Sequence, residues 1–345
     1  MNTPSVSILV PIYNVSEYIE RCAHSLFQQS FEDIEYVFVN DCTPDDSIEK
    51  LQKVIEQYPD RKERVKIIHH EKNRGLAAAR NTALDNSTGK YVQHIDSDDW
   101  VEPDMIELMY NKAEAEQADI VVCDFVYERA NSREIARNFI PEHKEDYFIC
   151  IVEHNATHPC VWNKLVRRQL CELPDCRSVE GLNFAEDYQI STRWYYYAEK
   201  IVKVDKVLYH YNKMNNSALT ASKTTMHYEN IILLFELLGD FMKEKGLYEK
   251  HIDTLERLKV TMKAGFFMGT EDYKLMRKYV LLYRDIEMKY LKTLNRVEKI
   301  VLFLTHYKMY YLAFLTAKLI RWKVKYVNSN IHTNKFTLAF SARSI

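Results

Sequence analysis

The stretch Val92–Trp100 reads VQHIDSDDW and decides the fold class of this chain. Its apolar start is typical of a buried strand, and the strand runs into three carboxylates within four residues. In extended backbone alternate side chains share a face, so Asp96 and Asp98 are predicted to point one way and Asp99 the other. Ligands of open α/β sheets bind beyond the carboxyl ends of the strands, which is where these carboxylates fall.

The chemistry of paired carboxylates points to a divalent cation. Two carboxylates held together repel each other unless a cation or protons neutralise them. Oxygen-only ligands favour a hard ion such as Mn²⁺ or Mg²⁺, which completes its shell with waters and substrate phosphates. The competing interpretation is an acidic turn that caps the next helix, with Asp99 or Pro103 near the start of that helix.

Strand and helix patterns alternate through the first 130 residues. This alternation is typical of an α/β domain whose mainly parallel sheet is flanked by helices. Strands are predicted at 6–12, 34–39, 65–68, 91–95 and 120–127, and helices at 16–28, 44–55, 76–84 and 105–115. Residues 185–197 indicate a further helix and 201–211 a further strand, and the pattern is helical from 225 to about 325.

Composition describes an ordinary globular protein with one unusual segment. The chain has 345 residues, 47% hydrophobic and 28% charged, which excludes a disordered chain. The formal net charge is −2, yet residues 273–325 carry 13 Lys and Arg against three acidic residues. A basic, aromatic segment favours contact with a polyanion, either nucleic acid or an anionic membrane surface. No recognised nucleic-acid-binding motif accompanies the charge, so we expect no nucleic-acid partner.

Cysteine spacing and the N-terminus favour the cytoplasm. The seven cysteines include no CxxC pair, so no zinc spacing is present, and a disulfide framework is unexpected in a chain of this length. No basic segment precedes the apolar run at 6–12, and no run of 18 uncharged apolar residues occurs. We therefore expect a cytoplasmic protein without a membrane-spanning helix.

Two further segments that follow predicted strands carry candidate ligand-binding residues. Gly75 precedes a helix, where a glycine lets the backbone approach a ligand and the helix N-terminus favours anions. Arg74 and Arg80 would add positive charge near a diphosphate, or else they are surface arginines at a plain loop-to-helix junction. Asp41 would accept a hydrogen bond from a nucleotide base, or act as a turn residue. Neither a P-loop nor a GxGxxG motif is present.

Together these segments resemble the family-2 glycosyltransferases, which have the GT-A fold. The resemblance covers about residues 4–110 and depends on motifs in a fixed order. They are Val6–Asn14, Asn40-Asp41, Asn73–Gly75 with Ala79–Asn81, Gly89–Tyr91, Asp96–Asp99 and Pro103-Asp104. The resemblance implies a nucleotide-sugar donor, a divalent metal and an inverting transfer to an acceptor hydroxyl.

The resemblance also implies which residues bind the donor. Pro11 and Tyr13 would line the nucleotide pocket, and Asp41 would contact the base. Arg80 would lie near the phosphates, and Asp96 would hold the ribose or the metal. The full donor-binding set of this region is Pro11, Tyr13, Asn14, Asp41, Arg74, Gly75, Arg80, Asp96 and Ser97, and Asp98 joins Asp96 as a ligand of Mn²⁺ or Mg²⁺.

The loop after Asp41 departs from the family pattern. The family commonly has Gly-Ser at this point, and this chain has Cys42-Thr43. A cysteine in backbone with positive φ would be strained. The departure therefore predicts a differently shaped loop and leaves the identity of the base open.

The resemblance places the general base in the acceptor half, in a Glu-Asp pair that starts a helix. Glu186-Asp187 matches this pair. Inversion by direct displacement needs one carboxylate to take the proton of the acceptor hydroxyl as the sugar–phosphate bond breaks. We predict Asp187 as the base and Glu186 as the second choice. Alternatively, both are surface charges favoured by the helix dipole.

Two later segments resemble the capsule and lipopolysaccharide branch of the family, Trp162–Leu165 and Leu208–Tyr211 with a trailing serine. Lys164 would meet the acceptor or a phosphate, and His210 or Ser217 would approach the diphosphate. The alternatives are structural: a lysine that extends along apolar surface to reach water, and a core histidine.

The predicted organisation has three parts. Residues 1–130 form the nucleotide-sugar-binding half of the GT-A domain, 131–222 the acceptor-binding half, and 223–345 a helical C-terminal extension. Within the extension, residues 297–325 either lie in the membrane interface, attracted by anionic lipid, or pack on the catalytic domain.

The sequence therefore predicts a hexosyl- or N-acetylhexosaminyl-transferase. It would move a sugar from a nucleotide-sugar, with a UDP-sugar as the first expectation, to a glycan or lipid-linked saccharide in surface polysaccharide synthesis at the inner face of the cell membrane. One alternative is a sugar nucleotidyltransferase, which usually has a Gly-rich, basic loop where this chain has Pro11–Asn14. The other is a catalytically silent GT-A-like protein that binds glycans.

Overall fold

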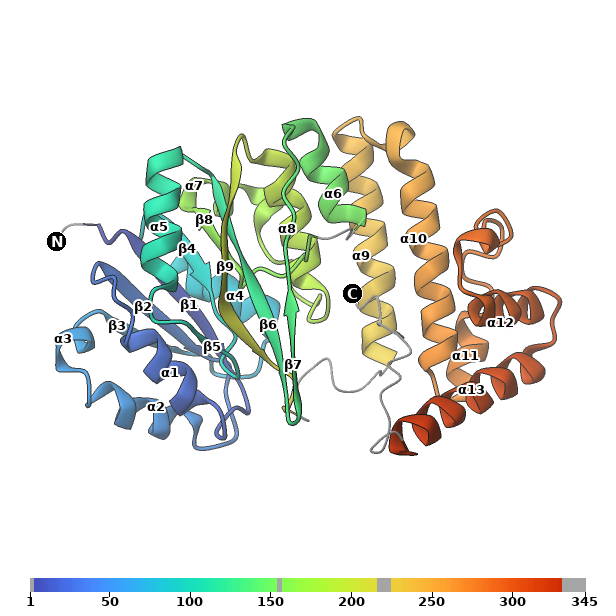
Figure 1. Ribbon diagram of the computed structural model, residues 1–345, viewed down its shortest axis with the longest axis horizontal. Helices are drawn as coiled ribbons and strands as arrows, with labels where there is room; N and C mark the ends of the chain where they lie inside the picture. The colour runs from blue at the N-terminus through green and yellow to red at the C-terminus, as the bar shows by residue number, and fades with distance from the viewer. Residues whose placement is uncertain (1–2, 154–156, 216–224, 331–345) are drawn as a thin grey trace. The chain divides into compact units, whose positions relative to one another are not determined.

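The computed structural model describes residues 3–153, 157–215 and 225–330. The chain divides into two compact units, Met1–Ala221 and Ser222–Ile345. The first unit contains the sheet and the helices that cover it, and the second is helical (Figure 1). The predicted α/β class with a C-terminal helical extension is confirmed.

The first unit alternates strands and helices. Its first part contains β1 (Val6–Ile12), α1 (Ile19–Phe27), β2 (Ile34–Asn40), α2 (Ser47–Ile55), α3 (Pro59–Lys62), β3 (Val65–His69), α4 (Leu76–Asp85), β4 (Tyr91–His94), β5 (Trp100–Val101) and α5 (Met105–Glu116). Its second part contains β6 (Ile120–Arg129), β7 (Ser132–Ala136), η1 (Lys144–Asp146), α6 (Tyr147–Glu153), β8 (Lys164–Arg167), α7 (Arg168–Cys171), η2 (Pro174–Cys176), α8 (Glu186–Tyr197) and β9 (Ile201–Asn212).

The described strands form one sheet in the order β3-β2-β1-β4-β8-β6-β9-β5, with β7 paired to β6. β1, β2, β3 and β4 are parallel, because helical crossovers return the chain to the same end of the sheet each time. β8 runs antiparallel to both β4 and β6, whereas β6 and β9 are parallel. The sheet is therefore parallel from β3 to β4 and mixed beyond β4.

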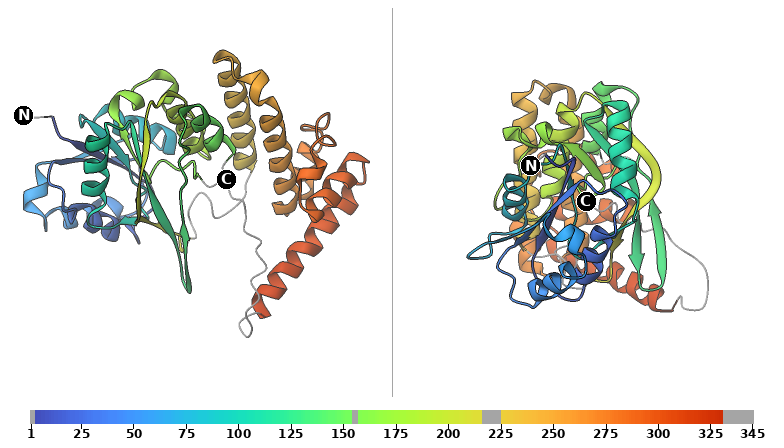
Figure 2. Two further views of the ribbon diagram at one scale, coloured as in Figure 1. Left: turned by 45° about the horizontal axis from the view of Figure 1, so that its top comes forward. Right: turned by 90° about the vertical axis from the view of Figure 1, so that its left-hand side faces the viewer.

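Both faces of the sheet are buried, which explains the continuous apolar runs of its strands. On β1, Ile8 and Val10 face a cluster with residues of α1, α2 and α5. Leu9 faces the opposite cluster, which contains residues of α4 and α8. Figure 2 shows the helices on both sides of the sheet from two further directions. Every residue of β1 is buried, so the strand is a fixed support for the loop that follows it.

The predicted helix start at 105 is confirmed, whereas the predicted starts at 16 and 44 are wrong. α1 begins at Ile19, because the Ser16 hydroxyl donates to Asp46 instead of capping a helix. α5 begins at Met105 after Asp104. The carboxylate of Asp99 is engaged elsewhere, so the acidic turn does not cap α5.

The second unit contains α9 (Thr225–Glu244), α10 (Tyr248–Gly269), α11 (Tyr273–Tyr279), η4 (Leu291–Thr293), α12 (Arg296–His306) and α13 (Tyr310–Asn330). Its own apolar core joins residues of all five α-helices. A buried ion pair lies beside this core, where Lys263 Nζ donates to Glu287 Oε2 over 2.5 Å. None of the described helices combines the length and apolar character needed to cross a bilayer.

Candidate active site

The carboxyl ends of neighbouring parallel strands bring the predicted donor residues to one edge. β1 lies between β2 and β4 and is parallel to both. Tyr13 and Asn14 follow β1, whereas Asp41 follows β2 and Asp96 lies two residues beyond β4. The pairing of β1 with β4 ends at Leu9, so Pro11 lies beyond it and its lack of an N–H leaves no hydrogen bond to β4 unmade. Tyr13 is 48% exposed, which leaves its ring accessible to a ligand.

The Asp41 carboxylate holds the loop at the start of α4. Its Oδ1 accepts from the backbone N–H of Arg74 at 2.8 Å, and its Oδ2 accepts from that of Gly75 at 2.8 Å. His70 donates from Nδ1 to the same Oδ1 at 2.6 Å, while its Nε2 lies 2.9 Å from Thr82 Oγ1. Asp41 therefore fixes the loop before α4 through its backbone N–H groups, and its contact with a base stays a prediction.

Gly75 is required at its position for two reasons. Its φ is +88°, and a Cβ there would lie 2.3 Å from Asn183 Oδ1. Asn183 belongs to the segment before α8, and its Oδ1 also lies 3.4 Å from the N–H of Ala77. Arg74 Nη2 donates to Glu180 Oε1 of the same segment at 2.8 Å. The loop predicted to meet phosphates thus contacts the segment before α8 directly.

The loop after Asp41 has a residue with positive φ at Cys42, the position where a cysteine was expected to be strained in that conformation. Cys42 has φ +57°, so the predicted change of loop shape is wrong. Asn40 Oδ1 accepts from the Thr43 N–H at 2.8 Å, and Thr43 Oγ1 accepts from the Asn14 N–H at 2.8 Å. These bonds fix both ends of the loop and offset the strain of the left-handed residue.

The three aspartates lie in a turn, because β4 ends at His94 and the Asp99 N–H donates to the Asp96 carbonyl at 3.1 Å. Extended alternation therefore does not orient the three side chains, and the predicted separation of Asp99 from the other two stays a prediction. Asp99 is fully buried and accepts from the Tyr209 hydroxyl and the Asn212 N–H, both at 2.7 Å. Burial and the charge of Asp98 raise the pKa of Asp99 well above its usual range.

Asp96 and Asp98 fit a hard cation by their chemistry. Burial, with the charge of Asp96, raises the pKa of Asp98 to about 6. A cation would relieve this mutual repulsion, and two carboxylates suffice for an ion that takes its other ligands from water and phosphate. Ser97 is buried between them. Among the described residues no group of three or more His, Cys, Asp or Glu side chains is arranged to hold a metal.

Glu186 and Asp187 begin α8, directly after Ala185 with φ +65°. They are not the solvated helix-end charges of the alternative interpretation, since Glu186 is only 4% exposed and Asp187 is half-buried. Burial raises the pKa of both carboxyls, and the Asp187 charge raises that of Glu186 further. A carboxyl with a raised pKa holds a proton more readily, which suits a general base.

Arg80 connects the two sets of carboxylates. It lies on α4, is 2% exposed, and its Nη2 donates to Asp96 Oδ1 at 2.9 Å and to Glu186 Oε1 at 3.3 Å. Its buried Nε and Nη1 have no hydrogen-bond partner within the described part of the chain. A buried guanidinium with two unused donors suits an anionic ligand such as a diphosphate.

Lys164 is fully buried at the start of β8 and does not reach the surface along its stem. Its ammonium donates to the carbonyls of His158 and Cys160 and to Asn163 Oδ1, at 2.7, 2.6 and 2.8 Å. All three donors are therefore used. The predicted contact with acceptor or phosphate would have to replace one of these bonds.

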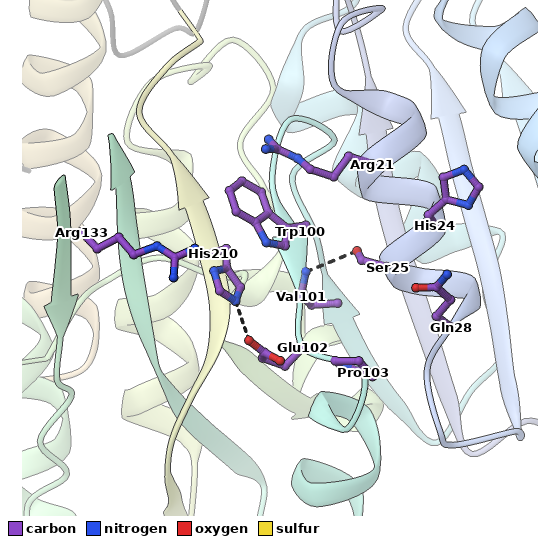
Figure 3. Close-up of a pocket in the computed structure, with 10 residues that line it drawn as sticks. All are labelled: Arg21, His24, Ser25, Gln28, Trp100, Val101, Glu102, Pro103, Arg133 and His210. Atoms are coloured by element: carbon purple, nitrogen blue, oxygen red, sulfur yellow. Dashed lines mark hydrogen bonds and ion pairs between the residues drawn. The ribbon is translucent and has the colours of Figure 1, made fainter. Parts of the chain in front are cut away.

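His210 lines an open cavity of about 770 Å³ together with residues of α1 and β5 (Figure 3). Its two ring nitrogens lie 2.8 Å from Glu128 Oε1 and from Glu102 Oε1, and its ring stacks on Trp100 at 5.0 Å. This arrangement matches the core-histidine alternative better than an approach to the diphosphate. Ser217 lies outside the described residues.

Sequence reasoning missed several residues that position the site. His70 and Asn183 orient Asp41 and the Gly75 loop, and Tyr209 holds Asp99 from 110 residues away. Asn215 donates to Asp98 Oδ2 at 2.8 Å. A buried carboxylate needs donors, so a search for polar residues at the ends of later strands would have suggested Tyr209 and Asn215.

Known proteins share this sequence pattern and this fold. The family model described as Glycosyl transferase family 2 matches residues 7–173. The putative glycosyltransferase EpsH of Bacillus subtilis is 33% identical over 264 residues, 74% of each chain. The putative teichuronic acid biosynthesis glycosyltransferase TuaG of the same organism is 38% identical over 104 residues, 30% of this chain and 40% of TuaG.

Among solved structures, S. aureus TarS 1–349 in complex with UDP-GlcNAc matches with a TM-score of 0.64 at 19% identity, covering 92% of both chains. That likeness confirms the GT-A fold. Because EpsH is one-third identical over three quarters of the chain, and the matched segment carries the strands that Asp41 and Asp96 follow, the chain belongs to glycosyltransferase family 2.

Proposed function

We propose that this glycosyltransferase inverts the anomeric centre as it moves a hexosyl or N-acetylhexosaminyl group from a UDP-sugar to an acceptor hydroxyl. The donor would bind over the ends of β1, β2 and β4, with Tyr13 and Asp41 at the nucleotide and Arg80 at the diphosphate. The acceptor would approach from the start of α8.

The observation that carries the proposal is the position of Arg80. One guanidinium nitrogen contacts both Asp96, on the donor side, and Glu186, on the acceptor side. A donor sugar held near Asp96 would therefore lie close to the Glu186-Asp187 pair. Direct displacement needs this proximity, because the base and the leaving group act on opposite sides of one carbon.

In the proposed step, the Asp187 carboxylate takes the proton of the acceptor hydroxyl. The acceptor oxygen forms a bond to the anomeric carbon as the bond from that carbon to the β-phosphate oxygen breaks. UDP leaves with the bonding electron pair, and Arg80 offers its unused donors to the developing charge. Glu186 stays paired to Arg80 and positions it.

A divalent cation, Mn²⁺ or Mg²⁺, would be held by Asp98 and Asp96 and would supply charge neutralisation for the diphosphate. The raised pKa of Asp98 supports this assignment, because an unneutralised pair of carboxylates is unfavourable there. Donor binding should then require the metal, and the metal should bind more tightly with UDP present.

The acceptor in this proposal is a glycan or lipid-linked saccharide of a surface polysaccharide. TuaG and the fold relative TarS support the polysaccharide class and the UDP-sugar respectively, by what their names state of them. The reaction would take place at the inner face of the cell membrane, with peripheral contact through residues 297–325.

The test is a screen of UDP- and GDP-sugars with Mn²⁺ by thermal shift, followed by detection of released nucleotide. A donor at 100 times its Kd should stabilise the protein by about 2.7 kcal/mol. Release of UDP supports the proposal. Stabilisation without release would favour a silent glycan-binding protein, and release of pyrophosphate from a nucleoside triphosphate and a sugar phosphate would favour a nucleotidyltransferase.

A further inference from the structure

Exposed apolar side chains gather on the last two helices of the second unit. Of 14 large hydrophobic residues that are exposed in the described part of the chain, eight lie between Ile300 and Trp322. They are Ile300, Phe303, Tyr307, Met309, Tyr311, Leu312, Leu319 and Trp322, exposed by 44–65%. Scattered single apolar residues are normal on a surface, but a concentration of this kind marks a binding surface.

The exposure is not a sign of poor packing, because the opposite sides of the same helices are buried. Val301 and Leu302 of α12, and Ala313 and Ala317 of α13, are at most 1% exposed within the core of the unit. This burial is packing within the second unit, and the predicted alternative for 297–325, packing on the catalytic domain, stays a prediction. The burial leaves the other side of each helix apolar as well.

The exposed residues follow helical spacing. Ile300 and Phe303 of α12 and Tyr307, the residue directly after its end, are three and four residues apart, so they form one stripe. Leu312 and Leu319 are seven residues apart on α13 and share its outer side in the same way. We call these residues the outer stripes. Two adjacent helices therefore each present an apolar stripe to solvent.

Basic residues accompany the outer stripes. From Arg296 to Lys323 the chain has six Lys and Arg against a single acidic residue. That acidic residue, Glu298, is used in the capping box of α12 with Asn295. Lys308, Lys318 and Lys323 are exposed. Apolar stripes accompanied by lysines fit a partner surface that combines an apolar interior with anionic groups at its boundary with water.

We propose that the outer stripes of α12 and α13 dock the protein on an anionic lipid bilayer, with the stripe residues among the acyl chains and the lysines at the head groups. This deepens the proposed function, because a lipid-linked acceptor presents its saccharide at that surface. A second copy of the chain is a poor occupant, since two faces with the same positive charge repel each other. The helices would lie in the interface, as none can span it.

Deleting the segment cannot test this proposal, because removal of α12 and α13 would open the core they help to form. Substitutions of exposed residues avoid that problem. The apolar variant is Phe303→Ser with Leu312→Ser and Leu319→Ser, whose side chains are 46%, 46% and 65% exposed. Its matched control carries Ile135→Ser and Phe139→Ser, which are 54% and 56% exposed in the first unit.

The charge variant is Lys308→Gln with Lys318→Gln and Lys323→Gln. Its matched control replaces Lys53, Lys62 and Lys250 with Gln, which are exposed and lie elsewhere in the chain. Near an anionic surface each lysine contributes about fivefold in partitioning, so the three together give on the order of 100-fold at low salt. Burial of the three stripe side chains contributes at least as much.

The assay is co-sedimentation of the full chain with vesicles of phosphatidylglycerol and phosphatidylcholine, and with phosphatidylcholine alone. We expect binding to the anionic vesicles that weakens with salt, falls about 100-fold in the charge variant and falls at least as far in the apolar variant. Both controls should bind like the unsubstituted chain. Failure of the full chain to bind at low salt overturns the proposal, as does equal loss in the controls.

Sedimentation without vesicles tests the rival occupant. A dimer that the apolar variant dissociates would assign the outer stripes to a second copy and overturn the proposal. The outcome is separable from the enzymatic one. A chain that releases UDP but ignores vesicles contradicts only the docking surface, whereas one that binds vesicles and turns over no donor contradicts only the transferase proposal.

Discussion

Arg80→Gln removes the guanidinium that joins Asp96 to Glu186, and it should weaken the fold and the reaction together. Gln cannot carry the charge, so two carboxylates that are now paired at 2.9 and 3.3 Å would lose their shared cation. Breaking a buried ion pair by removing one partner costs about 3–5 kcal/mol. For a unit of this size that corresponds to a fall in Tm of roughly 6–20 °C.

The matched control is Arg177→Gln. Arg177 pairs with Asp85 at 2.8 Å, but both side chains are partly exposed, at 32% and 57%. An exposed pair contributes about 0–1 kcal/mol, so this variant should melt within a few degrees of the unsubstituted chain. Thermal unfolding without metal or donor measures both variants.

A second substitution tests the cause of the loss. Adding Glu186→Gln to Arg80→Gln removes one of the uncompensated carboxylates, so the double variant should be more stable than Arg80→Gln alone. The reasoning is refuted if Arg80→Gln melts no lower than Arg177→Gln, or if Glu186→Gln adds its own loss in full.

Three other predictions concern the metal, the pH dependence and the glycine loop. Asp98→Asn should leave the metal-free fold intact, because the raised pKa of Asp98 already disfavours its charged form. The same variant should lose the Mn²⁺-dependent stabilisation by UDP in a thermal-shift assay. Full turnover by this variant at ordinary Mn²⁺ levels would contradict the metal assignment. The raised pKa of the Glu186-Asp187 pair should place the acid limb of the kcat/KM profile above the ordinary aspartate pKa of about 3.9, so activity should fall as pH falls through that limb. The same raised pKa stabilises the folded state at acid pH, and this contribution is lost as pH rises through the raised pKa. A limb near pH 4 in the pH–rate profile would contradict the raised pKa. Gly75→Ala should raise KM for the donor and lower the free energy of unfolding by about 1–3 kcal/mol more than Gly181→Ala does. Both glycines have positive φ, but of the two only Gly75 has a side chain within reach of an added Cβ, at 2.3 Å. Equal losses for the two variants in denaturant unfolding would contradict the close-approach argument.

The parallel part of the fold is readable from the sequence because its signals are local. β1 is buried on both faces and therefore appears as an unbroken apolar run. Asp41 and Asp96 follow strands that lie on either side of β1, so the rule that parallel strands share a carboxyl edge brings them together. The start of α8 was recognisable from Glu186-Asp187 through the resemblance.

The contacts that complete the site are not local, and this is why they escaped prediction. Arg80 meets Glu186 across 106 residues, and Tyr209 meets Asp99 across 110. Sequence periodicity fixes which face a residue takes, but not its partner in another element. The backbone of Cys42 shows the same limit, since neighbouring hydrogen bonds hold a conformation that the residue type alone disfavours.

The tail shows a different kind of ambiguity. Its apolar and basic residues fitted either packing or membrane contact, and periodicity cannot decide when both sides of a helix are apolar. The structure assigns Val301 and Ala313 to the core and leaves Phe303 and Leu319 exposed. One side of each helix packs within the second unit, and the exposed side is the one for which we propose membrane contact.

The base assignment is tested most directly by Asp187→Asn, with donor binding and UDP release measured on the same protein. The base faces the acceptor, so the Kd for UDP-sugar with Mn²⁺ should stay within about threefold of the unsubstituted chain, while UDP release falls by on the order of 10²–10⁴-fold. Undiminished release by Asp187→Asn would contradict the mechanism. A larger loss in Glu186→Gln, with donor binding intact, would move the base to the other member of the pair.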